Sequence, residues 1–126
     1  MTVRVSGHKR MSQFVPQVSE EDIERVLRRD FPAEHHQELW EMIQRVEVRE
    51  KPRVILACMK NAGGDVQKLK GNLNEASGYY REIIGEAEYP FYSKKMFRID
   101  KLFEPERAAI IEKDKKQYLD WCNRKP

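Results

Sequence analysis

The run Glu34-His35-His36-Gln37-Glu38 holds two of the three histidines of the chain beside two carboxylates, so it is the first place to look for a metal site. Adjacent residues of a helix point about 100° apart, so His35 and His36 do not both face one metal ion. The zincin pattern also needs two histidines four residues apart with the glutamate between them. We therefore expect a solvated or partly buried histidine pair and no metal site.

Other catalytic patterns are incomplete. Nucleophilic catalysis needs a base beside the nucleophile and an oxyanion site, and the histidines are too few and too scattered to build this set around Cys58 or a serine. Gly63-Gly64-Asp65 places an acid where a phosphate-binding loop needs lysine followed by serine or threonine. The sequence thus predicts no catalytic residue and no cofactor, and we expect the protein not to be an enzyme.

Three carboxylates, Glu82, Glu86 and Glu88, follow one another closely in a segment with helical periodicity. Acid–base work would need two of them held together in a closed site. Charged residues at this spacing more often form the solvated face of a helix, and that is our interpretation.

Aromatic and arginine side chains gather around the end of the same segment. Tyrosine and arginine are enriched at the centres of protein interfaces, so these residues predict a docking surface for another protein or for a second copy of the chain. The alternative is that aromatic residues at helical spacing belong to the core, as Tyr80 does by its position. The candidate partner-binding residues are Tyr79, Arg81, Tyr89, Phe91 and Tyr92.

A lysine-rich face is the second hypothesis, and it would serve nucleic acid if the lysines converged beside aromatic residues. The candidate residues are Lys94, Lys95, Lys113 and Lys116. The lysines are interspersed with acids, and the net charge of +3 is a small difference between 24 basic and 21 acidic residues. Charge alone therefore favours nucleic acid only weakly.

The most apolar stretch follows Pro52 and predicts a central helix over residues 52–62. Proline is well suited to the first turn of a helix, and the residues after it are apolar on nearly every side, which is typical of a helix buried on more than one face. Gly63 and Gly64 predict its end. Asp65 is then placed to cap the next helix.

From Val66 onward, apolar residues at positions 66, 69, 73, 76, 80, 83, 84 and 87 predict one stripe along a helix. The pattern leaves open whether this is one helix or two, because the pair Ser77-Gly78 is a plausible kink or break. Gly71, Gly78 and Gly85 fall on the opposite side, where they are either tolerated on an exposed face or admit another backbone. Pro90 predicts the end of the segment.

The rest of the chain is organised around this centre. Residues 1–18 lack a helical period and predict a flexible arm, with a short edge strand over residues 2–5 as the alternative. Ser19 is placed to cap a first helix. A second helix is expected to end near Val48, residues 91–104 to form an irregular strap with a short helix capped by Ser93, and a last helix to open at Pro105.

The central run resembles a group of small bacterial proteins of unassigned function, whose core reads R-V-x-L-A-x-x-K-x-A-x-G-D-x-x-K-L and then A-x-x-x-Y-R-x-x-I-x-x-A-E-Y-P. The resemblance covers about a third of the chain clearly and implies an all-helical bacterial protein, without implying any catalytic residue. Gly78 stands where the group tends to be charged. The matching positions are Arg53, Val54, Leu56, Ala57, Lys60, Ala62, Gly64, Asp65, Lys68, Leu69, Ala76, Tyr80, Arg81, Ile84, Ala87, Glu88, Tyr89 and Pro90.

We therefore predict an all-α protein, a compact bundle of five or six helices, with residues 19–126 as a single domain behind the arm. Cys58 and Cys122 are far apart and belong to no CxxC pair, so buried thiols are expected. The N-terminal residues lack a signal-peptide pattern, and no apolar run is long enough to span a membrane. The expected function is a non-enzymatic, cytoplasmic protein-interaction module, with a nucleic-acid-associated protein as the alternative.

Overall fold

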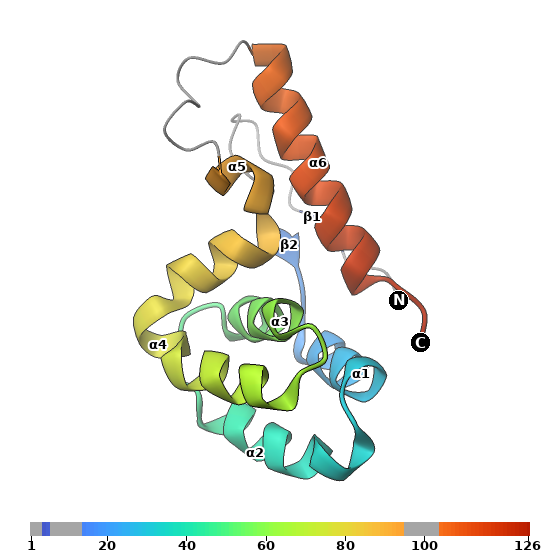
Figure 1. The fold of residues 1–126 in the computed structure, drawn as a ribbon, viewed down its shortest axis with the longest axis vertical. Coiled ribbons are helices and arrows are strands. Elements are labelled where there is room, and N and C mark those ends of the chain that lie inside the picture. Colours follow the sequence, from blue (N-terminus) through green and yellow to red (C-terminus); the bar gives the residue numbers. More distant parts are fainter. Residues whose placement is uncertain (1–3, 6–13, 95–103) are drawn as a thin grey trace.

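A computed structural model describes residues 4–5, 14–94 and 104–126 of the chain. Six α-helices make up most of this part, and α3 lies among the other helices (Figure 1). The predicted all-α bundle is confirmed. No helix in the described part combines the length and the apolar character needed to cross a bilayer.

The first two helices begin and end on local signals. Helix α1 spans Glu20–Asp30. It is capped as predicted, because the backbone N–H of Ser19 donates to Asp22 Oδ2 at 2.9 Å. After the 3-10 turn Ala33–His35, helix α2 spans His36–Arg45. It therefore ends three residues before the predicted end at Val48.

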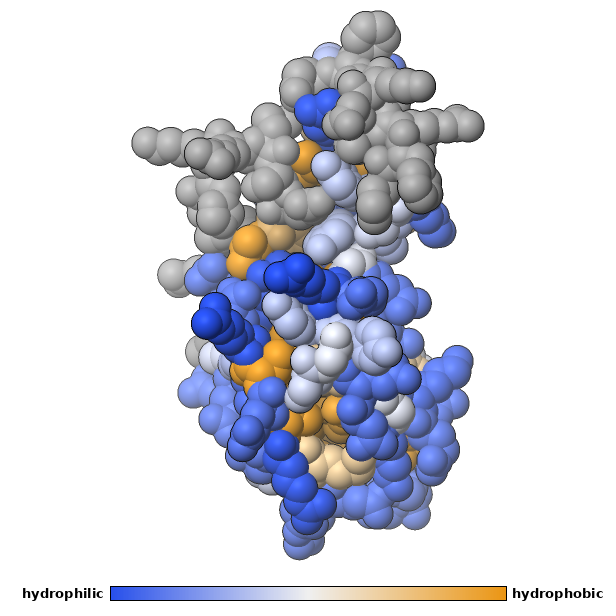
Figure 2. All heavy atoms as spheres, turned by 90° about the vertical axis from the view of Figure 1, so that its left-hand side faces the viewer, coloured by the Kyte–Doolittle hydropathy of each residue, from blue (hydrophilic) through white to orange (hydrophobic). Residues whose placement is uncertain are grey.

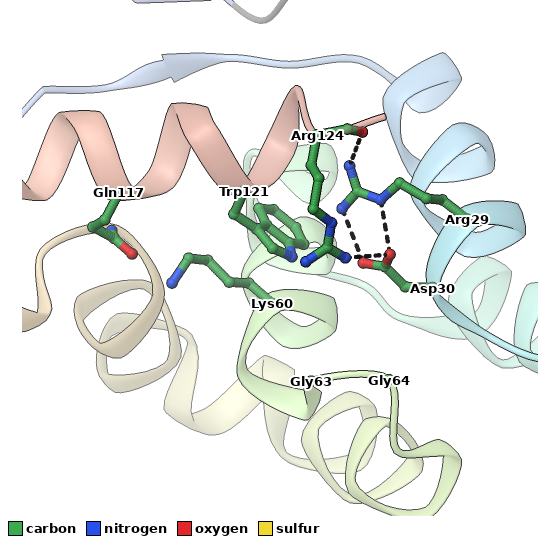
Figure 3. Close-up of a pocket in the computed structure, with 8 residues that line it drawn as sticks. All are labelled: Arg29, Asp30, Lys60, Gly63, Gly64, Gln117, Trp121 and Arg124. Carbon is green, nitrogen blue, oxygen red and sulfur yellow. Dashed lines mark hydrogen bonds and ion pairs between the residues drawn. The ribbon is translucent and has the colours of Figure 1, made fainter. Parts of the chain in front are cut away.

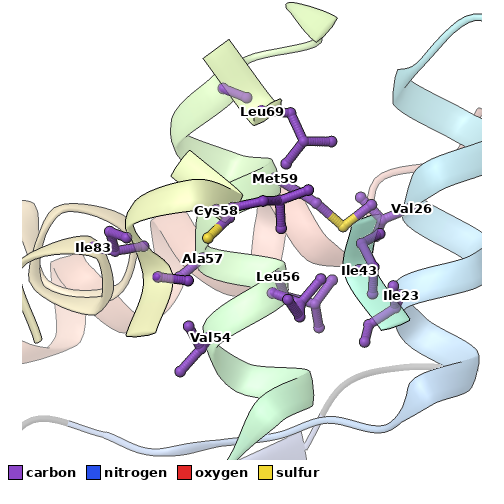
Figure 4. Close-up of a cluster of buried hydrophobic side chains, with 14 of the residues drawn as sticks. Ile23, Val26, Ile43, Val54, Leu56, Ala57, Cys58, Met59, Leu69 and Ile83 are labelled. Carbon is purple, nitrogen blue, oxygen red and sulfur yellow. The ribbon is translucent and has the colours of Figure 1, made fainter. Parts of the chain in front are cut away.

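Helix α3 spans Lys51–Ala62 and is the centre of the core. Every residue from position 54 to position 59 is buried. Figure 4 shows side chains from α1 and α2 packed against α3 on one side and Ile83 on the other. The helix ends at Gly63, whose φ of 59° is the left-handed conformation that glycine adopts without steric cost. The predicted central helix and its end are thus confirmed.

Helix α4 spans Val66–Glu88 and answers the question of one helix or two. It consists of two helical segments in line, joined at a kink at Tyr79, whose φ of −124° and ψ of 27° are not helical. The kink lies one residue after the predicted break. Asp65 caps it by accepting a hydrogen bond from the backbone N–H of Lys68 at 3.0 Å. The packing of α3 against α4 is the most extensive helix–helix contact in the described part.

The three glycines of α4 divide between the two interpretations. A Cβ atom at Gly71 or Gly78 would meet nothing within 4 Å, which fits a tolerated, exposed glycine. Gly85 is buried, and a Cβ there would lie 3.5 Å from Ser93 Oγ and 3.5 Å from the ring of Tyr89. The chain after α4 therefore folds back over Gly85, and of the two interpretations the close approach of another segment holds for this glycine.

Helix α5, Pro90–Lys94, replaces the first part of the predicted strap. Ser93 lies inside this helix and does not cap it, because the helix begins earlier, at Pro90. The remainder of the strap up to position 103 lies outside the described residues. Helix α6, Glu104–Cys122, is the predicted last helix, and its C-terminal half lies beside α3 and the end of α1 (Figure 1).

Part of the predicted arm is packed against the bundle. Strand β1, Arg4–Val5, pairs antiparallel with strand β2, Pro16–Gln17, in line with the edge-strand alternative. Phe14 is buried and packs edge-to-face against Tyr118 of α6, with ring centroids 5.6 Å apart. Residues 1–3 and 6–13 of the arm lie outside the described residues.

Both cysteines are free and buried, as predicted. Cys58 lies in the centre of α3, where burial raises the pKa of its thiol to about 12. Cys122 lies at the end of α6, where burial raises the pKa of the thiol and the nearby Arg25 guanidinium opposes that change. Neither thiol has the lowered pKa of a reactive cysteine.

Candidate functional site

The end of α4 is fixed by a buried ion pair. Glu88 is fully buried, and Arg53 at the start of α3 donates to both of its oxygens, from Nε to Oε2 and from Nη2 to Oε1, each at 2.7 Å. Burial raises the pKa of Glu88, while Arg53 opposes that rise. Of the three clustered carboxylates, Glu82 and Glu86 are exposed as expected, but Glu88 is a structural anchor.

Helix α5 is held by α6. Asp114 is 1% exposed and accepts the backbone N–H of Phe91 at 2.8 Å and that of Tyr92 at 3.1 Å. One turn later, the amide of Gln117 donates to the carbonyl oxygens of Ala87 and Glu88 at 3.0 and 3.3 Å. These bonds fix how α5 turns back against the second half of α4.

A groove of about 550 Å³ lies between α4 and α5. Gly85 is part of its lining, with Tyr89 and Pro90 beside it, and Arg81 and Lys94 add cationic groups. Figure 2 looks onto the α4 side of the molecule and shows hydrophobic residues set among a mostly hydrophilic surface. The groove's other lining residues are Glu82, Glu86 and Ser93.

The predicted partner-binding residues divide between this groove and its surroundings. Arg81 and Tyr89 line the groove. Tyr79 lies at the kink and is 59% exposed, outside the groove lining. Tyr92 is half-buried and meets Tyr89 edge-to-face at 6.4 Å, while Phe91 is half-buried against lysines.

The predicted lysine face is formed in part. Lys94 and Lys113 both lie over the ring of Phe91, with Nζ at 5.9 and 4.1 Å from the ring centroid. Lys116 instead pairs with Asp120 on its own helix at 2.7 Å. Lys95 lies outside the described residues.

A second cavity, of about 500 Å³, lies where α1, α3 and α6 end (Figure 3). Arg29, at the end of α1, makes two bonds to the carboxylate of Asp30, at 2.7 and 2.9 Å, and donates to the backbone oxygens of Cys122 and Arg124. Arg124 also donates to Asp30, at 2.8 Å. The ring of Trp121 lies under the Arg29 guanidinium, at 5.4 Å.

The opposite side of this cavity is lined by Lys60, in the last turn of α3, and by Gln117 of α6. In Figure 3 the Lys60 amine and the Arg124 guanidinium lie on opposite sides of the Trp121 indole. Burial lowers the pKa of Lys60, which the charges of Glu86 and Asp114 oppose. The amine makes no hydrogen bond or ion pair to any residue that the structure describes.

Sequence reasoning missed this cavity because Lys60 and Arg124 are far apart in the chain and meet only in the folded protein. One local signal was present. Lys60 is the only charged residue between positions 54 and 64, the most apolar stretch of the chain. Lysine is rarely buried unless it is paired, so a lysine in a helix buried on several faces indicates a specific role.

The histidine pair lies at the turn that leads into α2. His35 and His36 are both half-buried, as predicted, and His36 Nε2 lies 2.6 Å from the backbone oxygen of Phe31. Within residues 4–5, 14–94 and 104–126, no group of three or more His, Cys, Asp and Glu side chains is arranged to hold a metal ion.

Comparison of the chain with protein-family models, with curated proteins and with solved structures gives no significant match.

Proposed function

We propose that this chain is a non-enzymatic, cytoplasmic protein-interaction module, and that the groove between α4 and α5 binds a short segment of a partner protein. The observation that carries the proposal is the lining of the groove. It combines an apolar floor around Gly85 and Tyr89 with cationic groups from Arg81 and Lys94. Its volume fits one or two side chains of a partner, in the range of pockets for small ligands.

The chemistry of the groove defines the partner segment. An aliphatic or aromatic anchor side chain would enter the groove beside Gly85, Tyr89 and Pro90, which line it. An acidic residue beside the anchor would pair with Arg81, whose described contacts are with the neighbouring Tyr80. Burying the anchor contributes about 1.5 to 3 kcal/mol, and an exposed ion pair adds at most about 1 kcal/mol. We therefore expect a weak, reversible interaction that depends mainly on the anchor.

Bacterial origin belongs to the same proposal and rests on the resemblance of residues 53–90 to small bacterial proteins. The partner could also be a second copy of this chain. Sedimentation of the purified protein over a range of concentrations separates the two cases, because self-association raises the apparent mass with concentration and a separate partner does not.

The test uses a display library of random short peptides, selected on the purified full-length chain. The peptides that bind should share an apolar anchor with a neighbouring Asp or Glu. A synthetic peptide of that sequence should lose binding to a Gly85→Leu variant, whose side chain fills the groove, and should bind Arg81→Glu more weakly.

The matched control is Gly71→Leu, which places the same side chain on the same helix in open space. It should bind the peptide like the unchanged protein. Circular dichroism of each variant verifies the helical fold. If no selected peptide distinguishes Gly85→Leu from Gly71→Leu, the groove is not the docking site.

A nucleic-acid-associated protein is the second candidate. The observation that favours it is the convergence of Lys94 and Lys113 on Phe91. It predicts binding to single-stranded oligonucleotides that falls steeply with salt. A Lys94→Gln, Lys113→Gln double variant should bind more weakly, and indifference to oligonucleotides at low salt removes this candidate.

A further inference from the structure

We propose that the cavity between the ends of α1, α3 and α6 binds a small organic anion with a planar ring, of the nucleoside monophosphate class. This site is separate from the α4–α5 groove and shares no lining residue with it. It does not depend on the protein-binding proposal.

The first step is the charge of the cavity. Three cationic side chains, Arg29, Lys60 and Arg124, face a single carboxylate, Asp30. The side chain of Arg29 is 2% exposed and makes four bonds, to Asp30 and to two backbone oxygens, so the Arg29–Asp30 pair is structural and electrically neutral. The charge that remains for a ligand is that of Lys60 and Arg124.

The second step is the state of these two cations. Arg124 is 58% exposed and uses one nitrogen for Asp30, which leaves the other donors of its guanidinium for a ligand. The half-buried amine of Lys60 has three donors and no hydrogen-bond or ion-pair partner among the described residues. The charges of Glu86 and Asp114 act on this amine without a direct contact, and a bound anion would give its donors a direct partner.

The third step is the flat surface between the cations. Trp121 lines the cavity, and its indole separates the Lys60 amine from the Arg124 guanidinium in Figure 3. Arg29 lies over the Trp121 ring and Tyr118 meets it edge-to-face, and the ring also lines the cavity. An inorganic anion would use the cations and leave this cavity-lining part of the indole unused. A ligand that joins a planar ring to a phosphate would stack on the indole and place its phosphate at a cation.

Gln117 completes the lining. Its amide nitrogen donates to three backbone oxygens, of Ala87, Glu88 and Asp114, which fixes the orientation of the side chain. Its carbonyl oxygen makes no hydrogen bond to a described residue and is left as an acceptor beside the donors of Lys60 and Arg124. This oxygen suits the exocyclic amino group of a base, as in adenine.

The test is fluorescence titration of the full chain with adenosine monophosphate. The chain has two tryptophans, so a Trp40→Phe variant makes Trp121 the only indole. Adenosine monophosphate should change the Trp121 emission in a saturable way at low salt. Adenosine alone and inorganic phosphate alone should each bind more weakly, because each provides half of the contacts.

Lys60→Met in this background removes the charge and keeps the length of the side chain. It should weaken binding by at least about tenfold, the effect of losing one charge-assisted hydrogen bond. Lys68→Met is the matched control, since Lys68 is an exposed lysine of α4 outside the cavity lining, and it should bind like the parent.

Stability separates binding from folding. Lys60→Met removes a charge from a half-buried position, so the variant should be as stable as the parent or more stable while it binds less well. Residues that bind a ligand often lower the stability of the fold, so a variant that is more stable but binds less well is typical of such a position. The proposal is overturned if millimolar adenosine monophosphate leaves the Trp121 emission unchanged, if Lys60→Met and Lys68→Met bind equally, or if inorganic phosphate alone binds as well.

Discussion

Removing either partner of the Arg53–Glu88 pair should destabilise the protein, but by different amounts and with different pH dependence. Glu88 is fully buried, whereas the Arg53 side chain is 16% exposed and has a second partner, Glu50, at 3.3 Å. Arg53→Met leaves a buried carboxylate with no counter-charge, which costs about 3 to 5 kcal/mol at neutral pH. Glu88→Met leaves an arginine that keeps Glu50 and solvent, and should cost about 1 to 3 kcal/mol.

The pH dependence of Arg53→Met follows from the pKa of Glu88. Burial already raises this pKa in the unchanged protein against the effect of Arg53, so removing Arg53 raises it further. A carboxyl group whose pKa is higher in the folded state contributes its stability below the unfolded pKa, and that contribution is lost as pH rises. Once the pH exceeds the raised pKa that Glu88 has in the parent, the variant should lose up to about 1.4 kcal/mol per pH unit relative to the parent.

Urea unfolding followed by circular dichroism at pH 5 and pH 7 measures both effects. The deficit of Arg53→Met should grow by up to about 2.7 kcal/mol over this interval. That of Glu88→Met should shrink, because the raised pKa of Glu88 makes the parent itself lose stability as pH rises, and the variant lacks this group. The double variant, with methionine at both positions, should recover part of the loss. An equal deficit of Arg53→Met at the two pH values, or a larger deficit for Glu88→Met, would refute this account of the pair.

Three further predictions concern single positions. Gly71→Ala should stabilise the protein by about 0.5 to 1 kcal/mol, because the new Cβ enters open space on a helix. Gly63→Ala should destabilise it by about 1 kcal/mol, because φ at this position is 59°. The midpoints of urea unfolding measure both effects, and equal midpoints for the two variants would contradict the backbone conformations assigned to these glycines. The thiols of Cys58 and Cys122 should react with Ellman's reagent at pH 8 only as fast as the protein opens, and at once in denaturant. Burial raises the pKa of Asp30, but Arg29 and Arg124 outweigh it and hold this pKa below its ordinary value of 3.8, so Asp30 stabilises the fold above pH 3.8. The stability gap between the parent and Asp30→Asn should therefore narrow as pH falls below 3.8, and a gap that stays constant in acid titrations would contradict this.

The helices were predictable from the sequence because their signals are local. The cap at Ser19, the left-handed end at Gly63 and the cap at Asp65 each depend on residues within one turn. The kink at Tyr79 was likewise indicated by the neighbouring Ser77-Gly78 pair. Helix caps, helix ends and kinks are set by neighbouring residues, so a pattern of a few residues suffices to predict them.

The failures concern residues whose environment comes from distant parts of the chain. Glu88 was expected in a solvated cluster, and it is buried because Arg53 lies opposite it on another helix. For Gly85 the sequence left exposure and the close approach of another segment open, and the glycine is covered because α5 turns back over it. The partner of each residue, Arg53 for Glu88 and α5 for Gly85, lies outside the local sequence pattern. Helical periodicity alone therefore does not show that these residues are buried.

The candidate sites likewise divide into one whose residues are close in sequence and one assembled from distant parts of the chain. The sequence predicted that aromatic and arginine residues at the end of α4 gather at a surface, and it named Arg81 and Tyr89 among them. It did not indicate the cavity around Lys60, because the cavity is assembled from the ends of three helices.

Helix α6 is the element that both sites have in common. It positions α5 through Asp114, and it lines the second cavity with Gln117 and Trp121. Its attachment to α1 is polar, since Arg25 and Arg29 both donate to the backbone oxygen of Cys122, at 2.7 and 3.0 Å. Directional bonds of this kind fix an angle between helices more sharply than apolar contact does, but each contributes only about 1 to 3 kcal/mol. A ligand at the end of α6 would add contacts to this attachment, and through Asp114 it would also stabilise the wall of the groove.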